Sequence, residues 1–252
     1  MKQSEYLKVL KLAKRTLQEY KNWGEEEVSK DAIPEKPSAN LSKEQPCAQS
    51  AQKSSSKDSQ SPAQRLEALK KKLDSCKKCA LGHGRLNCVF GEGSAEADLM
   101  FVGEGPGFDE DHKGLPFIGR AGQLLTKIIE AMGKTRESVY IANIVKCHPM
   151  QDPSDPEKRG NDRPPTPEEM ESCKPFLDMQ IEIIKPKIIV TLGASSTKGL
   201  LKNEESISAI RGNFKEYNGI KLMPTYHPAA LLRNPSLKKA VWEDMKQVMK
   251  HL

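Results

Sequence analysis

An acidic, glycine-rich loop follows the apolar residues 99–102 and reads GEGPGFDED over residues 103–111. Gly105 and Gly107 allow a ligand to approach the backbone closely. The loop lacks the lysine and hydroxyl of a P-loop, and its carboxylates would repel a phosphate. We therefore predict a site that needs a carboxylate, from among Glu104, Asp109, Glu110 and Asp111, beside a tight turn. Such a loop at the carboxyl end of a buried strand is where open α/β sheets place their sites.

Four cysteines form a second group of residues that could bind a metal or react. Cys76 and Cys79 make a CxxC pair, and Cys147 and Cys173 lie far downstream. Four thiolates brought together by the fold suit either an iron–sulfur cluster or a structural zinc, and the spacing does not separate the two. Cys88 is the spare cysteine, and we expect it to be buried in a strand as a small apolar residue.

Alternating strand and helix patterns must position these residues. Short apolar runs predict strands at 86–90, 99–102, 139–145, 188–192 and 222–225. Amphipathic patterns predict helices from residue 63, from residue 123, from Pro167 behind a Thr166 cap, and over 242–249. Asn218-Gly219 predicts a small hairpin within 212–220. We expect an α/β fold with three αβα layers around a mostly parallel sheet of about four strands.

Composition divides the chain into three regions. Residues 1–23 predict an amphipathic helix with an apolar stripe that includes Tyr6, Leu10, Leu17 and Tyr20. Residues 24–62 are rich in Ser, Lys, Glu, Gln and Pro, and we expect a disordered linker. Residues 63–252 should form the folded domain. The helix could dock on its own domain, contact DNA or bind a protein partner.

The overall charge and hydropathy exclude some classes of protein. The chain has 252 residues and a formal net charge of +6, which is compatible with a polyanionic partner. No apolar run is long enough to span a membrane, and the N-terminus does not read as a secretory signal. We therefore expect a cytoplasmic protein without a membrane partner.

Several long motifs occur in an order that resembles one known family. They are CxxC at 76–79, VFGEG at 89–93, MFVGEGPGFDED at 100–111, GLPFIGRAGQLL, VYIANIVKCHP, NDRPPTPEEMESC, IKPKIIVTLG and MPTYHPAALLRNP. From about Leu73 to Trp242 the chain resembles the family 4 uracil-DNA glycosylases, the iron–sulfur branch of the uracil-DNA glycosylase superfamily. It departs from them in the N-terminal extension and in an apparent insertion around residues 152–160.

The resemblance implies a monomeric DNA-repair enzyme that flips uracil out of DNA and hydrolyses its N-glycosidic bond without cutting the strand. It implies the following site residues: Glu104, Glu110 and His227 for catalysis; Gly105, Gly107, Phe117, Asn143 and His227 for uracil; Leu231, Leu232 or Arg233 as the DNA wedge; and Cys76, Cys79, Cys147 and Cys173 for a [4Fe-4S] cluster. Asp109 and Asp111 are expected to shape the turn or to be solvated. His227 could instead only cap the chain from Pro228 onward.

Two alternative functions remain open at this point. One is a glycosylase of relaxed specificity that also removes hypoxanthine or other deaminated bases. The other is a non-catalytic, cluster-bearing DNA-binding module. Glu104, Asn143 and His227 favour the enzyme, because a binding module needs no carboxylate near DNA phosphates.

Overall fold

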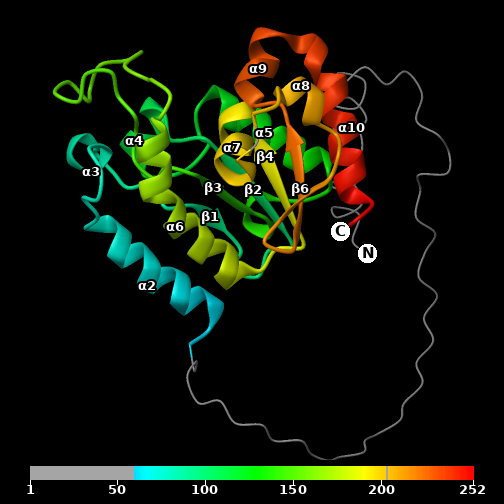
Figure 1. Cartoon of the computed structure of the whole chain (residues 1–252), viewed down its shortest axis with the longest axis horizontal. Helices are drawn as coiled ribbons and strands as arrows, with labels where there is room; N and C mark the ends of the chain where they lie inside the picture. Colours follow the sequence, from blue (N-terminus) through cyan, green and yellow to red (C-terminus); the bar gives the residue numbers. More distant parts are fainter. Residues whose placement is uncertain (1–59, 203) are drawn as a thin grey trace, which may run out of the picture. The chain divides into compact units, whose positions relative to one another are not determined.

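Four parallel strands form the centre of a six-stranded sheet in the computed structural model, which describes residues 60–202 and 204–252 (Figure 1). The strand order is β1-β3-β2-β4-β6-β5, and β1 and β5 pair antiparallel at the two edges. The strands are β1 (Glu92–Gly93), β2 (Leu99–Gly103), β3 (Tyr140–Asn143), β4 (Ile188–Leu192), β5 (Lys215–Tyr217) and β6 (Ile220–Thr225). The mostly parallel sheet predicted from the sequence is confirmed.

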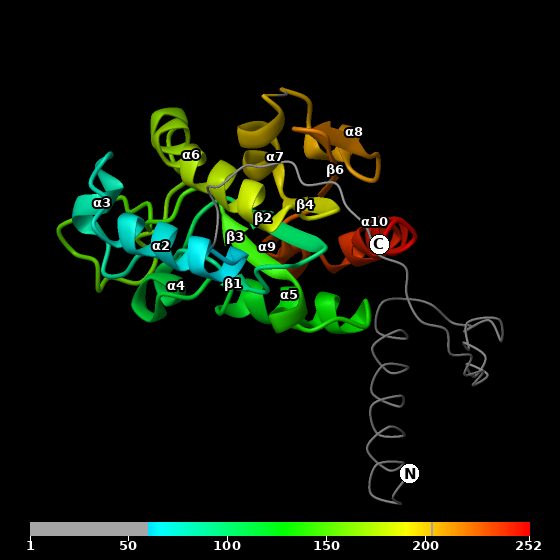
Figure 2. The same cartoon turned by 90° about the horizontal axis from the view of Figure 1, so that it is seen from below.

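Helices cover both faces of this sheet (Figure 2). On one face lie α6 (Pro167–Ile184) and α7 (Ala194–Leu201), with α2 (Pro62–Asp74) packed along α6. On the other lie α5 (Arg120–Ala131), α9 (Pro228–Arg233) and α10 (Lys238–Met249). Every residue of β2 and β4 is buried, as expected for strands covered on both sides. The shorter elements are α3 (Leu81–Gly84), α4 (Phe108–Lys113), η2 (Arg136–Ser138), α8 (Ile207–Ile210) and η3 (Pro235–Leu237).

Several elements begin or turn at the capping and turn residues that the sequence predicted. The Thr166 side chain accepts a hydrogen bond from the Glu169 N–H, and Pro167 begins α6. Asn218 and Gly219 both have positive φ, 50° and 79°, which is typical of the tight turn that joins β5 to β6. The last helix begins at Lys238, earlier than its apolar pattern predicted.

The strand predicted at 86–90 is wrong. The backbone N–H groups of Leu86 and Asn87 donate to the carboxylate of Asp111 instead of to a neighbouring strand. Cys88 therefore lies in a loop, although it packs against the core and burial raises the pKa of its thiol to about 11. The edge strand β1 starts four residues further on.

The predicted N-terminal helix (1–23) and nearly all of the predicted linker (24–62) lie outside the described residues. Pro62–Leu252 form one compact unit. Among residues 60–202 and 204–252, no helix combines the length and the apolar character that a membrane span needs.

Candidate active site

Polar side chains from three parallel strands meet at the carboxyl edge of the sheet. Glu104 follows β2, Asn143 ends β3, and His227 follows β6. They line a cavity of about 410 Å³, within the size range of small-molecule sites. The full lining is Glu104, Gly105, Pro106, Gly107, Glu110, Phe117, Ala121, Asn143, Pro149, Asp162, Arg163, Pro165, His227, Ala229 and Arg233. Predicted base-binding and catalytic residues from across the chain thus share one cavity.

An amide and an aromatic ring form the inner part of this cavity. Asn143 is only 1% exposed, and its Oδ1 atom has no hydrogen-bond partner. Phe117 is buried, and its ring centroid lies 5.7 Å from that of His227. A Cβ atom on Gly103 would lie 2.3 Å from Asn143 Oδ1 and 2.4 Å from Phe117 Cζ, so only glycine fits between the two side chains. A buried acceptor without a partner is costly and points to a missing donor.

The two ring nitrogens of His227 have different roles, since Nδ1 caps a helix and Nε2 does not. Its Nδ1 atom accepts a hydrogen bond from the Ala229 N–H at 3.1 Å and so caps α9. Burial and, to a smaller extent, the nearby Arg233 lower the pKa of His227 to about 4. The ring is therefore neutral near pH 7, and because Nδ1 accepts, the proton sits on Nε2. The helix cap, which was the alternative role expected of His227, is present, and it leaves Nε2–H available as a donor.

The two candidate carboxylates have different surroundings. Burial raises the pKa of Glu104, and a hydrogen bond from the Ser195 side chain partly offsets this. Glu104 Oε1 is buried without a hydrogen-bond partner. In Glu110, Oε1 accepts from the N–H groups of Ile118 and Gly119, each at 3.0 Å, and Oε2 accepts from the Gly107 N–H at 3.2 Å. Glu110 thus ties the acidic loop to the start of α5, whereas Glu104 keeps an oxygen free.

Asp111 is fully buried, so the expectation that it could be solvated is wrong, and its turn-shaping alternative holds. Its carboxylate accepts from Leu86 and Asn87 and faces His148, whose Nδ1 lies 3.6 Å away. The contact with His148 and the backbone hydrogen bonds from Asn87 and Leu86 keep the pKa of Asp111 below its usual range despite burial.

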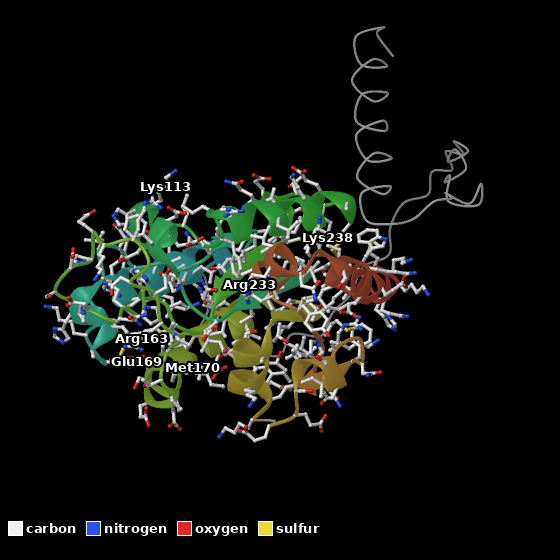
Figure 3. All side chains as sticks on the ribbon, turned by 90° about the horizontal axis from the view of Figure 1, so that it is seen from above. Lys113, Arg163, Glu169, Met170, Arg233 and Lys238 are labelled. Carbon is white, nitrogen blue, oxygen red and sulfur yellow. The ribbon has the colours of Figure 1, made fainter. Side chains whose placement is uncertain are left out.

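Helix α9 places the three wedge candidates differently. Leu231 is fully buried against the domain, so it is not available as a wedge in this conformation. Leu232 is 42% exposed, and Arg233 lines the cavity. Figure 3 looks onto this side of the domain and labels Arg233 together with Arg163, Lys113 and Lys238, which come from three other segments.

The loop over residues 149–165 forms a cavity wall that the sequence did not predict. It contributes Pro149, Asp162, Arg163 and Pro165. Arg163 makes a two-pronged pair with Glu169, at 2.7 and 2.8 Å, and so fixes the loop to the start of α6 (Figure 3). Its polar, proline-rich composition gave no sign of a contact with the site. Ser195 was also missed, since its only signal is its place just after β4.

The four predicted cysteine ligands line one small cavity between α2, α3 and α6. Leu73 and Phe176 supply much of its apolar lining. Among the described residues, no three His, Cys, Asp or Glu side chains are arranged to hold a single metal ion. Two cations lie close by. Arg85 Nη1 donates to Cys147 Sγ at 3.0 Å, and the fully buried Lys146 donates to Gln180 Oε1 at 2.6 Å.

The fold and cavity define an α/β protein whose site lies at the carboxyl ends of parallel strands. Comparison with known proteins narrows this class. Residues 90–246 match the family model described as the uracil DNA glycosylase superfamily. The chain belongs to this superfamily.

Curated relatives place it further within the superfamily. It is 47% identical over 193 residues to a type-4 uracil-DNA glycosylase of Sulfurisphaera tokodaii, covering 73% of this chain and 83% of that protein. The type-4 uracil-DNA glycosylases of Saccharolobus solfataricus and Thermotoga maritima are each 44% identical to it. The matches cover 74% and 72% of this chain and 86% and 92% of those proteins. The resemblance of the motifs to the family 4 uracil-DNA glycosylases is confirmed.

Proposed function

We propose that this protein removes uracil from DNA by hydrolysing the N-glycosidic bond. The observation that carries the proposal is the pair of buried, unpartnered oxygens, Asn143 Oδ1 and Glu104 Oε1, in one cavity with Phe117 and His227. One oxygen needs a donor from a base, and the other needs a donor from water. A flipped uracil and an attacking water supply both.

Base selection follows from the amide of Asn143. Its Oδ1 accepts from N3–H of uracil, and its Nδ2 donates to O4. Cytosine presents the reverse pattern, an acceptor at N3 and a donor at C4, so it leaves the buried amide unsatisfied. Phe117 offers an aromatic face to the flipped ring.

Bond cleavage follows from the neutral histidine and the free carboxylate oxygen. As the C1′–N1 bond breaks, its electron pair goes to the base, and His227 Nε2–H donates to the charge that develops on uracil O2. The sugar becomes oxocarbenium-like. Glu104 stabilises this cation and orients a water, which adds to C1′ while the carboxylate accepts its proton. Glu110 supports the reaction by holding the loop in place.

The cavity lining also supports a monofunctional enzyme. A glycosylase that also cleaves the strand commonly uses an amine to form a Schiff base. No lysine occurs among the residues that line the cavity in the described part of the chain. The product is then an abasic site in an intact strand. We assign the filling of the gap left by the flipped nucleotide to the exposed Leu232 and to Arg233, and not to the buried Leu231.

We also propose that Cys76, Cys79, Cys147 and Cys173 hold a [4Fe-4S] cluster. All four cysteines line one cavity, and four thiolates are the usual ligands of such a cluster. The type-4 relatives, which the motifs resemble as the iron–sulfur branch of the superfamily, favour the cluster over a structural zinc. The buried ammonium of Lys146 donates to the neutral amide of Gln180, and an anionic thiolate-bound cluster would balance its charge. The cluster would join the α2–α3 segment to the residues after β3 and to α6.

A single-turnover assay tests the function. With enzyme in excess over a duplex that contains one uracil, we expect free uracil and a strand break that appears only after alkali. A duplex with hypoxanthine should react far more slowly. Glu104→Gln should abolish excision, and Asp98→Asn, which removes a carboxylate at the opposite end of β2, should not. A break without alkali, faster release of hypoxanthine, or no release at all would each contradict the proposal. A protein partner for the N-terminal helix, the monomeric state and the cytoplasmic location stay predictions.

A further inference from the structure

The aromatic wall of the cavity has an unfavourable backbone. Phe117 adopts φ = 52°, in the left-handed region that residues other than glycine, asparagine and aspartate rarely occupy. Such a conformation persists only where the surrounding structure holds it. The strained residue is buried and sits in the proposed uracil pocket. Something must therefore fix the backbone of Phe117.

Arg136 in η2 makes the contacts that do this. Its Nη1 donates to the Phe117 carbonyl oxygen at 3.1 Å, and its Nη2 donates to the Pro116 carbonyl oxygen at 2.7 Å. Nη1 also donates to Thr126 Oγ1 in α5 at 3.1 Å. The planar guanidinium thus binds two successive carbonyls and the helix that follows them. Only arginine offers donors in this fork geometry.

Glu92 holds the arginine in turn. Its Oε1 accepts from Arg136 Nε at 2.9 Å, and both side chains are largely buried. Glu92 lies in β1 directly opposite Ile141 of β3, two residues before Asn143. The GEG of the VFGEG motif, which has no role in the proposed chemistry, therefore ties the strand that carries the amide to the turn that carries the ring.

The position of the Phe117 ring affects the shape of the cavity, because the residues around the ring are closely packed. A Cβ atom on Gly122 would lie 1.8 Å from the Phe117 carbonyl oxygen, so α5 also fits tightly against this turn. The tip of the ring and Asn143 Oδ1 converge on Gly103. A small displacement of the Phe117 backbone would therefore change the space between the ring and the amide.

We propose that the Glu92–Arg136 pair is a positioning device that holds Phe117 in its left-handed conformation and so sets the geometry of the base pocket. This inference rests on the proposed function. Neither residue lines the cavity, so both act through Phe117. Arg136 is a positioning residue and takes no direct part in the reaction.

A double-mutant cycle tests the proposal by single-turnover kinetics. We expect Arg136→Gln to lower the excision rate at least tenfold. Arg136→Lys should not restore the rate, because an ammonium cannot bind both carbonyls. In a Phe117→Leu background the same arginine change should have less than a twofold further effect, because the two residues act as a unit. Arg120→Gln, an exposed change at the start of α5, is the control for lost positive charge near DNA. Equal losses in both backgrounds would overturn the proposal.

A spectroscopic readout separates this inference from the proposed function. With ¹³C-labelled phenylalanine, the Phe117 signal, assigned by its loss in Phe117→Leu, should shift or broaden in Arg136→Gln and remain in place in Arg120→Gln. An unchanged signal in Arg136→Gln would refute the positioning role even if the rate falls. If the wild-type protein releases no uracil, the proposed function fails, and the Phe117 signal still decides whether Arg136 positions the ring.

Discussion

Replacing His227 separates a catalytic donor from a helix cap, because its two nitrogens have different partners. Nδ1 caps α9 through the Ala229 N–H, and Nε2–H is the proposed donor to uracil O2. Loss of one preorganised donor to a developing anion slows the chemical step by roughly 10²–10³-fold, or about 2.7–4 kcal/mol. Loss of a capping side chain costs about 0.5–2 kcal/mol of stability. His227→Ala should therefore show both effects.

His227→Asn is the matched variant. Asparagine is a good N-cap residue, but its shorter amide does not extend as far into the cavity. We expect His227→Asn to unfold near the wild-type midpoint in urea and to excise uracil as slowly as His227→Ala. Binding of a uracil-containing duplex should change little in either variant, because the donor acts mainly on charge that develops during the reaction.

The assay is single-turnover uracil release with enzyme in excess, together with duplex binding and urea unfolding of each variant. Because burial lowers the pKa of His227 to about 4, the ring stays neutral throughout pH 5–8, and its titration should not shape the rate there. Recovery of the rate in His227→Asn would refute the donor role and leave the cap alone. Equal loss of DNA binding and rate would also refute it.

Three further predictions concern the other parts of the site. Asn143→Asp should lower the rate of uracil excision by roughly 10²-fold or more, since a carboxylate cannot donate to O4. Exposed Asn213→Asp is the control, and full activity in Asn143→Asp would show that the Asn143 amide does not bind the base. The rate should rise with pH through the pKa of Glu104, because only the ionised carboxylate accepts the proton. Burial raises that pKa above its ordinary value of 4.5, so the acid limb should lie higher than for an exposed glutamate, and a limb that persists in Glu104→Gln would contradict this assignment. If the proposed cluster is present, Lys146→Met should lower its reduction potential, since loss of a buried positive charge disfavours an added electron. Exposed Lys77→Met should leave the potential nearly unchanged, and equal potentials in the two variants would exclude Lys146 as the balancing charge.

The sequence by itself determined the central sheet and the class of site. Apolar runs such as residues 99–102 and 188–192 become strands because burial on both faces requires continuous hydrophobicity. Parallel strands then bring their carboxyl ends together, which gathers Glu104, Asn143 and His227 in one cavity. The length and order of the motifs were sufficient to identify the family.

Only the tertiary structure distinguished between residues of the same type. Glu104 and Glu110 are equivalent by composition, but backbone donors from residues 107, 118 and 119 occupy both oxygens of Glu110. Leu231 and Leu232 are adjacent leucines, and packing of α9 on α5 buries the first and exposes the second.

Buried charges and backbone strain were also decided by the tertiary structure. Lys146 reads as a solvated lysine after a strand, but the fold buries it beside cysteines from distant segments. The left-handed Phe117 and its support by Arg136, 19 residues away, have no local sequence signal. Periodicity reports which face of an element is apolar, whereas the partner of each polar atom depends on contacts between segments far apart in the chain.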